Sequence, residues 1–241
     1  MLYRIADFLI DIEPRFPLMR KHLEEYAYEG EGKADFSVRV TDEMLEKQRA
    51  AQPEFSLPYH ESTCILRVIA DTVVHRGCFL MHAAVIAVDG VAYAFTAKSG
   101  TGKSTHLRLW MEMLGDRAFV LNGDKPFLRL FEDGTVRAYG TPWCGKEGWQ
   151  RNTSLPLGGI CFLERDVTNH IRPLAANEAV ERIFSQLLKP STAAGLAATL
   201  DMADRVLAGV PLWLLGCNIS PEAAETSYKA MTGKSPQEKG D

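Results

Sequence analysis

The chain has 241 residues, of which 46% are hydrophobic and 24% are charged, so it can bury a substantial core and is not a disordered tail. Its 27 lysines and arginines stand against 31 acidic residues, and this slightly acidic balance excludes a general electrostatic grip on nucleic acid. The five cysteines are scattered and lack CxxC spacing, which disfavours a disulfide framework and a zinc site.

The N-terminal segment does not have the pattern of a secretion signal, because Arg4, Asp7 and Asp11 interrupt its apolar residues. No stretch of the sequence approaches the roughly 20 apolar residues that a membrane span needs. We therefore expect a cytoplasmic protein with reduced thiols and without a membrane partner.

The first part of the chain predicts a small α+β substructure. Apolar residues over 2–12 indicate a strand, residues 17–28 an amphipathic helix, and residues 36–51 a strand followed by a helix. The turn-rich segment 53–58 separates this part from the rest of the chain. We predict two units, a small N-terminal α+β substructure over residues 1–58 and a larger domain over residues 59–241.

The second part alternates helices with β-rich runs. Residues 61–75 have helical spacing and are followed by Gly77, a residue suited to a helix C-cap. The runs 79–88 and 91–96 surround Asp89-Gly90, a strong signal for a β-hairpin. The later predicted elements are helices over 105–114, 177–188 and 193–207 and from Ser220 onward, and strands over 119–122, 127–131, 136–139, 157–163 and 211–215.

A glycine-rich loop, residues 97–105 (the glycine loop), joins the second run of this hairpin to a predicted helix. Gly100 and Gly102 let the backbone turn tightly, so that its amides and the positive end of the helix converge on phosphate oxygens. Lys103 would reach the β- and γ-phosphates, and Ser104 would ligate Mg²⁺. The alternative is a flexible connection, but the strand-loop-helix context favours a P-loop that binds ATP through Lys98, Ser99, Gly100, Thr101, Gly102, Lys103, Ser104 and Thr105.

An acidic residue follows the next apolar strand, where a second contact to Mg²⁺ is needed. In the sequence Asn122-Gly123-Asp124-Lys125-Pro126, Asp124 is the candidate metal ligand. The segment also has turn composition, so an ordinary turn aspartate is the alternative.

From Phe79 to Leu163 the sequence resembles the superfamily of HPr kinases and ATP-dependent phosphoenolpyruvate carboxykinases. The resemblance is carried by Met81-His82-Ala83-Ala84, the Asp89-Gly90 hairpin, the glycine loop and Asn122-Gly123-Asp124, in this order and spacing. It implies a compact α/β P-loop nucleotide-binding core with a mixed, largely antiparallel sheet, so that residues 59–241 form a kinase-like domain.

The same resemblance implies roles for His82 and Asp124. HPr kinases carry a histidine ahead of the P-loop hairpin and two adjacent aspartates after the P-loop helix, one for the acceptor and one for the metal. His82 matches the histidine and Asp124 the second aspartate, whereas Gly123 stands in the first place and leaves the general base unassigned. Considered alone, His82 is equally well interpreted as a core residue.

Residues 140–152 form a second loop rich in glycine, cations and tryptophan (the tryptophan loop). Lys146 and Arg151 are candidates to neutralise the transferring phosphate or to hold an anionic substrate, and we predict that they face the γ-phosphate. Two exposed tryptophans would be unusual in a mere connection. The alternative is that the tryptophans anchor the loop and the cations are solvated.

Together these features predict an ATP-dependent kinase that transfers the γ-phosphate to a hydroxyl group on a peptide, protein or small molecule, with Lys103, Asp124, His82, Lys146 and Arg151 at the catalytic centre. A nucleotide-responsive binding protein without phosphoryl transfer is the alternative, and the missing first aspartate favours it. A carboxykinase is less well supported, since the sequence does not present a cluster of acid-binding arginines. The acceptor and the adenine-binding residues cannot be read from the sequence.

Overall fold

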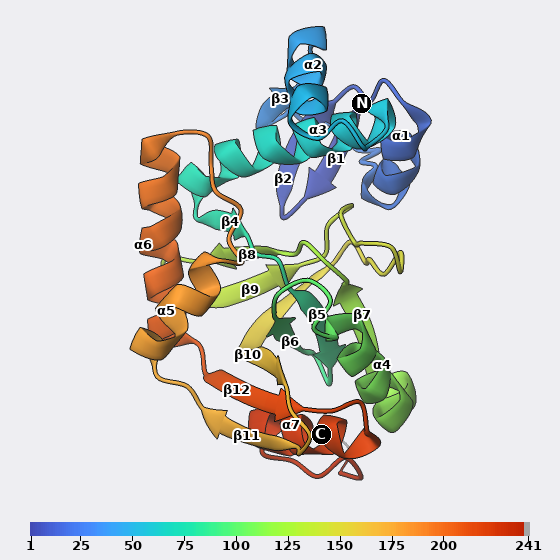
Figure 1. Cartoon of the computed structure of the whole chain (residues 1–241). Helices are drawn as coiled ribbons and strands as arrows, with labels where there is room; N and C mark the ends of the chain where they lie inside the picture. Colours follow the sequence, from blue (N-terminus) through green and yellow to red (C-terminus); the bar gives the residue numbers. More distant parts are fainter. Residues whose placement is uncertain (239–241) are drawn as a thin grey trace.

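The computed structural model describes residues 1–238 (Figure 1). Its N-terminal residues form a small sheet of three strands. A tight turn at Ala6 and Asp7, with φ angles of 51° and 65°, joins the first two strands. The single strand expected over residues 2–12 is therefore a β-hairpin, whose turn carries no glycine to mark it in the sequence. The strands are β1 (Leu2–Ile5), β2 (Phe8–Ile12) and β3 (Phe36–Val38).

Helix α3 connects this small sheet to the rest of the molecule. Its apolar residues share one buried cluster with Ile10 and Tyr26 on one side and with Phe127 and Tyr139 on the other. The helical segment that follows α3 ends at Gly77, whose φ of 75° gives the left-handed cap expected there. The division at residue 58 stays a prediction. The helical segments of this region are α1 (Pro17–Leu23), η1 (Glu24–Tyr26), α2 (Asp42–Ala51), α3 (Leu57–Val73) and η2 (Val74–Arg76).

A mixed sheet of nine strands curls through the larger part of the molecule in the order β4-β8-β9-β10-β6-β5-β7, with β12 beside β10 and β11 beside β12. The pairs β6–β10 and β10–β12 are parallel, and the others are antiparallel, as expected for a mixed, largely antiparallel sheet. The strands are β4 (Cys78–Leu80), β5 (Ala84–Val88), β6 (Val91–Thr96), β7 (Ala118–Asn122), β8 (Phe127–Leu130), β9 (Val136–Tyr139), β10 (Ser154–Arg165), β11 (His170–Pro173) and β12 (Leu212–Cys217).

Two segments pass from the half of this sheet that contains β4, β8 and β9 to the half that contains β5, β6, β7, β11 and β12. Strand β10 pairs first with β9 through residues 154–156 and then with β6 through residues 157–162. The run expected over 79–88 breaks at residues 81–83, because β4 pairs with β8 whereas β5 pairs with β6 and β7. This break places His82 at the junction between the two halves.

The predicted hairpin between β5 and β6 is confirmed. Asp89 and Gly90 have φ angles of 49° and 80°, the two positive values that a type I′ turn requires. Strand β11 was not predicted, since its short sequence from His170 to Pro173 is mostly exposed and contains a proline.

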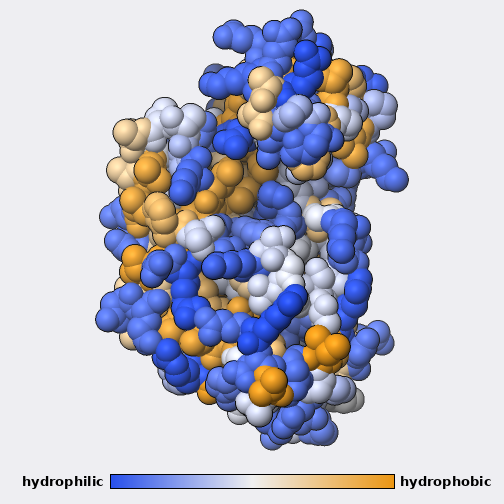
Figure 2. Space-filling view, in the orientation of Figure 1, coloured by the Kyte–Doolittle hydropathy of each residue, from blue (hydrophilic) through white to orange (hydrophobic). Residues whose placement is uncertain are grey.

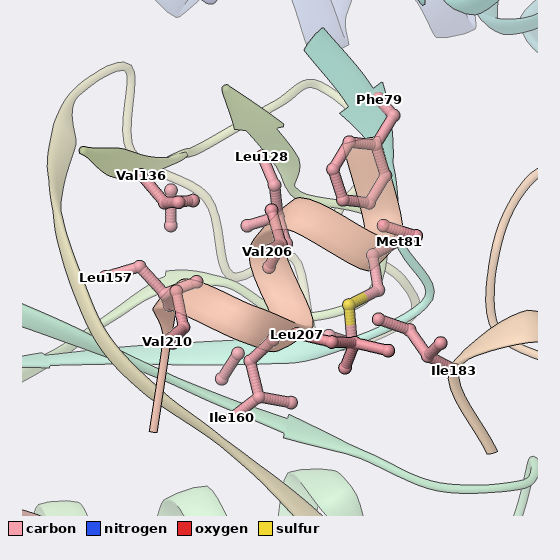
Figure 3. Close-up of a cluster of buried hydrophobic side chains, with 14 of the residues drawn as sticks. Phe79, Met81, Leu128, Val136, Leu157, Ile160, Ile183, Val206, Leu207 and Val210 are labelled. Atoms are coloured by element: carbon pink, nitrogen blue, oxygen red, sulfur yellow. The ribbon is translucent and has the colours of Figure 1, made fainter. Parts of the chain in front are cut away.

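Helices cover both faces of the large sheet. On one face Trp110 of α4 packs against Tyr228 of α7, with ring centroids 5.3 Å apart. On the other face Ile183 of α5 and Val206 of α6 join the buried cluster of Figure 3. These helical segments are α4 (Lys103–Leu114), η3 (Gly115–Arg117), α5 (Ala176–Phe184), α6 (Ala193–Gly209) and α7 (Pro221–Thr232).

The surface seen in Figure 2 is largely hydrophilic, and apolar side chains gather in its upper half between α6 and α3. Within residues 1–238, no helix is both long enough and apolar enough to cross a membrane.

Candidate phosphate-binding site

The glycine loop leaves β6 and leads directly into the first turn of α4. Gly100 and Gly102 have φ angles of 78° and 128°, and a Cβ atom at either position would meet no atom within 4 Å. Glycine is therefore required here for its backbone conformation and not for lack of space. The amides that open α4 need acceptors from outside the helix, and this end of the helix favours negative charge.

The side chain of Lys103 lies under the loop. It is buried, and its Nζ donates a hydrogen bond to the carbonyl oxygen of Ala97 at 3.1 Å. Burial lowers the pKa of Lys103, and the nearby charge of Asp124 partly opposes this shift. A buried ammonium with a single neutral acceptor is suited to an anion arriving at the loop.

The turn after β7 positions Asp124. The buried amide of Asn122 accepts hydrogen bonds at Oδ1 from the backbone N–H groups of Asp124 at 3.0 Å and Lys125 at 2.8 Å. Its Nδ2 donates to the carbonyl oxygen of Thr141 at 3.0 Å. Asn122 thus shapes the turn from within and ties it to the tryptophan loop.

The carboxylate of Asp124 has two cationic or hydrogen-bonding partners. His82 Nε2 lies 3.0 Å from Oδ1, and the ammonium of Lys125 pairs with Oδ2. Burial alone would raise the pKa of Asp124, but the hydrogen bond from His82 and the charge of Lys125 outweigh it and lower the pKa to about 2. Asp124 is therefore ionised throughout the neutral range.

The backbone of His82 is fixed from two sides. Its N–H donates to the carbonyl oxygen of Gln186 at 2.7 Å, and its own carbonyl oxygen accepts from Thr96 Oγ1 at 2.9 Å. Its side chain is about one-third exposed and does not belong to the buried core. This exposure and the contact with Asp124 favour a site residue over a core residue.

Gly123 is a glycine for steric reasons. A Cβ atom at this position would lie 2.6 Å from the carbonyl oxygen of Cys144, a backbone atom that cannot easily move. The neighbouring Asp124 is therefore the single carboxylate that this turn can present. The fold excludes the pair of adjacent aspartates that the family resemblance led us to look for.

These side chains line one cleft of about 540 Å³ at the start of α4. Lys146 of the tryptophan loop borders it, and so do Arg108 and Glu147, which form an ion pair across its rim. The residues of the cleft are His82, Ser99, Gly100, Gly102, Lys103, Ser104, Thr105, Arg108, Gly123, Asp124, Cys144, Gly145, Lys146 and Glu147.

Arg151, unlike Lys146, does not border this cleft. Its guanidinium lies over the ring of Phe119, 4.4 Å from the ring centroid, and it is not among the residues that line the cleft. Arg151 is therefore separated from Lys146, with which we expected it to share one site. The reason is the backbone N–H of Arg151, which donates to Leu121 and carries this end of the loop along β7.

The tryptophans of this loop are anchors. Trp143 is only 7% exposed, and its Nε1 donates to the carbonyl oxygen and hydroxyl of Ser62 at 3.2 and 3.0 Å. Trp149 is half-buried beneath the guanidinium of Arg108, 5.2 Å from its ring centroid. The alternative of anchoring tryptophans is thus correct for the aromatic residues, while Lys146 still reaches the cleft.

Sequence reasoning missed several residues that shape the site. Arg165, at the end of β10, donates to the carbonyl oxygens of Gly100 and of Thr101, the latter at 3.3 Å, and so holds the loop from outside. Nothing in the sequence near Arg165 signals this contact. Arg108 could have been found, because it follows Ser104 by four residues and so lies on the same helix face.

The chain offers the ligand types that Mg²⁺ commonly takes from protein. No group of three or more His, Cys, Asp or Glu residues within residues 1–238 could hold a metal alone. Mg²⁺, however, usually takes one or two protein oxygens beside phosphate and water oxygens. The Ser104 hydroxyl and the Asp124 carboxylate border the same cleft and fit this requirement.

No family model and no curated protein matches the chain. Among solved structures, one similar chain is the Hpr(Ser) kinase/phosphatase from Coxiella burnetii, with a TM-score of 0.34 and 11% sequence identity. The match covers 64% of this chain and 93% of that one. At these values the likeness is a distant one of fold, and nothing about the site rests on it.

Proposed function

We propose that the chain is an ATP-dependent kinase of the HPr-kinase-like P-loop type that transfers the γ-phosphate of ATP to a hydroxyl group. One observation carries the proposal: Lys103, Ser104, Asp124, His82 and Lys146 border a single cleft at the N-terminus of α4. They come from four separate segments of the chain. Anion binding, metal ligation and proton transfer thus meet at one place.

In this proposal the glycine loop and the first turn of α4 bind the β- and γ-phosphates through backbone amides and through Lys103. Lys146 faces the γ-phosphate end and stabilises negative charge on the oxygens of the transferring group. Mg²⁺, held by Ser104 and Asp124, would neutralise phosphate charge when bound.

His82 is our candidate for the acceptor side. Because Nε2 donates to the Asp124 carboxylate, Nδ1 is the ring nitrogen left with a lone pair. The acceptor hydroxyl gives its proton to Nδ1 as its oxygen bonds to the γ-phosphorus, the bond from that phosphorus to the bridging oxygen breaks, and ADP leaves. His82 thus takes the role of general base, which a carboxylate at position 123 cannot take because that residue is a glycine.

A nucleotide-responsive binding protein is the second candidate. The exclusion of a side chain at Gly123 favours it, since the acceptor-side aspartate of the resemblance is then missing. In that case ATP would order the tryptophan loop for a partner, and no phosphate would be transferred.

The test is transfer of labelled γ-phosphate from MgATP to a panel of serine- and threonine-containing peptides and small alcohols. Wild-type protein should label an acceptor, and Asp124→Asn should lose most turnover while ATP affinity falls much less. Lys146→Ala should slow transfer on the order of a hundredfold. Lys229→Ala, on the exposed face of α7, is the matched charge-removal control.

One result would contradict the mechanism, and another would contradict kinase activity itself. Full transfer by Asp124→Asn would remove the metal and histidine roles assigned to this residue. Binding of ATP with protection of residues 140–152 from hydrogen exchange, but without transfer to any acceptor, would favour the binding protein.

A further inference from the structure

A second cleft, of about 350 Å³, lies on the other side of the glycine loop. It shares Gly100, Gly102 and Thr105 with the cleft described above, so one bound molecule could lie across these residues and reach both. Its volume falls within the roughly 300–1,000 Å³ of small-molecule sites. Its other lining residues are Thr101, His106, Leu109, Leu163, Arg165, Asp166, Cys217, Asn218 and Ile219.

The position of this cleft follows from the parallel part of the sheet. Strands β6, β10 and β12 run in the same direction, so the glycine loop, Asp166 and Asn218 meet at their carboxyl ends. Ligands of open α/β sheets bind in the crevice outside these ends. Asp124 follows β7, on the opposite side of the loop, and borders the first cleft together with Lys146.

The walls of the second cleft are mainly apolar. Ile219 is 79% exposed although it is a large aliphatic residue, and Leu109 and Leu163 contribute further apolar surface. Two of its polar side chains already have partners within the protein: Asn218 bonds to Val167 and Ser220 at 3.1 and 2.9 Å, and Asp166 accepts from Thr168 at 3.1 Å.

We propose that this second cleft binds the nucleoside half of the triphosphate and that it holds the base by apolar contact, without reading its polar edge. The inference rests on the proposed function, because it needs the phosphates to lie on the glycine loop. A flat purine ring matches an apolar wall, and paired polar groups offer little discrimination between purines. ATP and GTP should therefore bind with affinities within about threefold of each other.

A larger cleft of about 870 Å³ beside α5 is the competing place for the base. It shares no lining residue with the cleft that contains Lys103 and Asp124. Its charged side chains, Glu164, Glu178 and Glu181 against Lys98, Arg165 and Arg182, balance one another, so charge does not decide between the two places. The absence of shared residues favours the smaller cleft.

The first measurement is calorimetry of Mg²⁺-bound ATP, GTP and inorganic tripolyphosphate with wild-type protein and Ile219→Ser. The variant should weaken both nucleotides on the order of tenfold, since apolar contact is lost, and leave tripolyphosphate unchanged. Val167→Ser is the matched control, because Val167 is 87% exposed in the neighbouring loop and does not line the cleft. Phe184→Ala probes the larger cleft.

A second measurement uses the thiol of Cys217, which lines the cleft and is the least buried of the five cysteines. ATP should slow alkylation of Cys217 several-fold, and tripolyphosphate should not.

The outcomes separate this inference from the proposed function. Wild-type protein that binds neither ATP nor tripolyphosphate contradicts the proposed function itself. Tripolyphosphate binding together with unchanged nucleotide affinity in Ile219→Ser, or a loss confined to Phe184→Ala, places the base elsewhere. A preference of more than about thirtyfold between ATP and GTP would contradict recognition by apolar contact alone.

Discussion

The glycine loop and the tryptophan loop border the same cleft, but they are held in different ways. Contacts among its own residues shape the glycine loop, since Thr101 N–H donates to Lys98 at 3.2 Å and Lys103 donates to Ala97, and Arg165 of β10 supports it from outside. The tryptophan loop is held by distant elements. Trp143 donates to Ser62 of α3, and the backbone N–H of Asn152 donates to the carboxylate of Glu25 of η1 at 2.7 Å. The glycine loop thus combines local contacts with support from β10, whereas the tryptophan loop is tied to the N-terminal part of the chain.

Where the tryptophan loop meets the N-terminal part, some buried polar atoms of the described residues have no hydrogen-bond partner. In the part of the chain that the structure describes, buried Tyr26 Oη, His22 Nδ1 and Gln150 Oε1 have no hydrogen-bond partner. Unpaired buried polar atoms cost free energy, so this interface is weaker than its buried area suggests. The N-terminal part therefore contacts the loop that carries Lys146 through an interface with unpaired polar atoms.

The largest effect is expected from Lys103→Met, which removes the buried ammonium and nearly preserves side-chain volume. ATP affinity should fall at least a hundredfold, about 3 kcal/mol, because a charge-assisted contact to phosphate is lost. Stability should not fall, since burial of the ammonium disfavours it in the folded protein. Calorimetry and thermal unfolding measure the two quantities, and intact ATP affinity would contradict the assignment of the loop.

A comparable effect on stability is expected from acid, through the packing of α4. Burial lowers the pKa of His106 from 6.5 to about 4, while its Nε2 lies 2.9 Å from Ser227 Oγ of α7. The unfolded chain therefore binds more protons between these values, and stability falls as the pH drops from about 6.5 to about 4. The full shift corresponds to about 3 kcal/mol of unfolding free energy.

His106→Gln should flatten this pH dependence in urea unfolding measured across the same range. His22 contributes with the same sign, because burial and then Lys21 lower its pKa. Asp124 acts at lower pH: its ionised form stabilises the fold above about pH 4, and this is lost as the pH falls toward 2. An unchanged slope in His106→Gln would show that α4 and α7 are not coupled through this residue.

The smallest effect is expected from Trp143→Phe, which keeps an aromatic ring and removes the hydrogen bonds to Ser62. Unfolding free energy should fall by about 1 kcal/mol, with faster hydrogen exchange over residues 141–150 and little change in ATP affinity. A double-mutant cycle with Ser62→Ala should be non-additive. Additive effects, or a large loss of ATP affinity, would erase the contrast between the two loops.

Much of the fold was predictable because its signals are local. The Asp89-Gly90 turn, the Gly77 cap and the helix after the glycine loop follow from backbone preferences of single residues. The hairpin at Ala6 and Asp7 was missed because those residues adopt positive φ without glycine. The break at residues 81–83 was missed because both halves of the run are apolar, and only strand pairing separates them.

The sequence by itself determined the glycine loop and the candidate roles of Lys103, Ser104 and Asp124, because their spacing and backbone needs are contained in adjacent residues. Tertiary structure decided the rest. It placed His82 against Asp124, brought Lys146 to the cleft while Arg151 packs on Phe119, and left no room for a side chain at Gly123 beside Cys144. These are contacts between segments far apart in the chain, and no local preference encodes them.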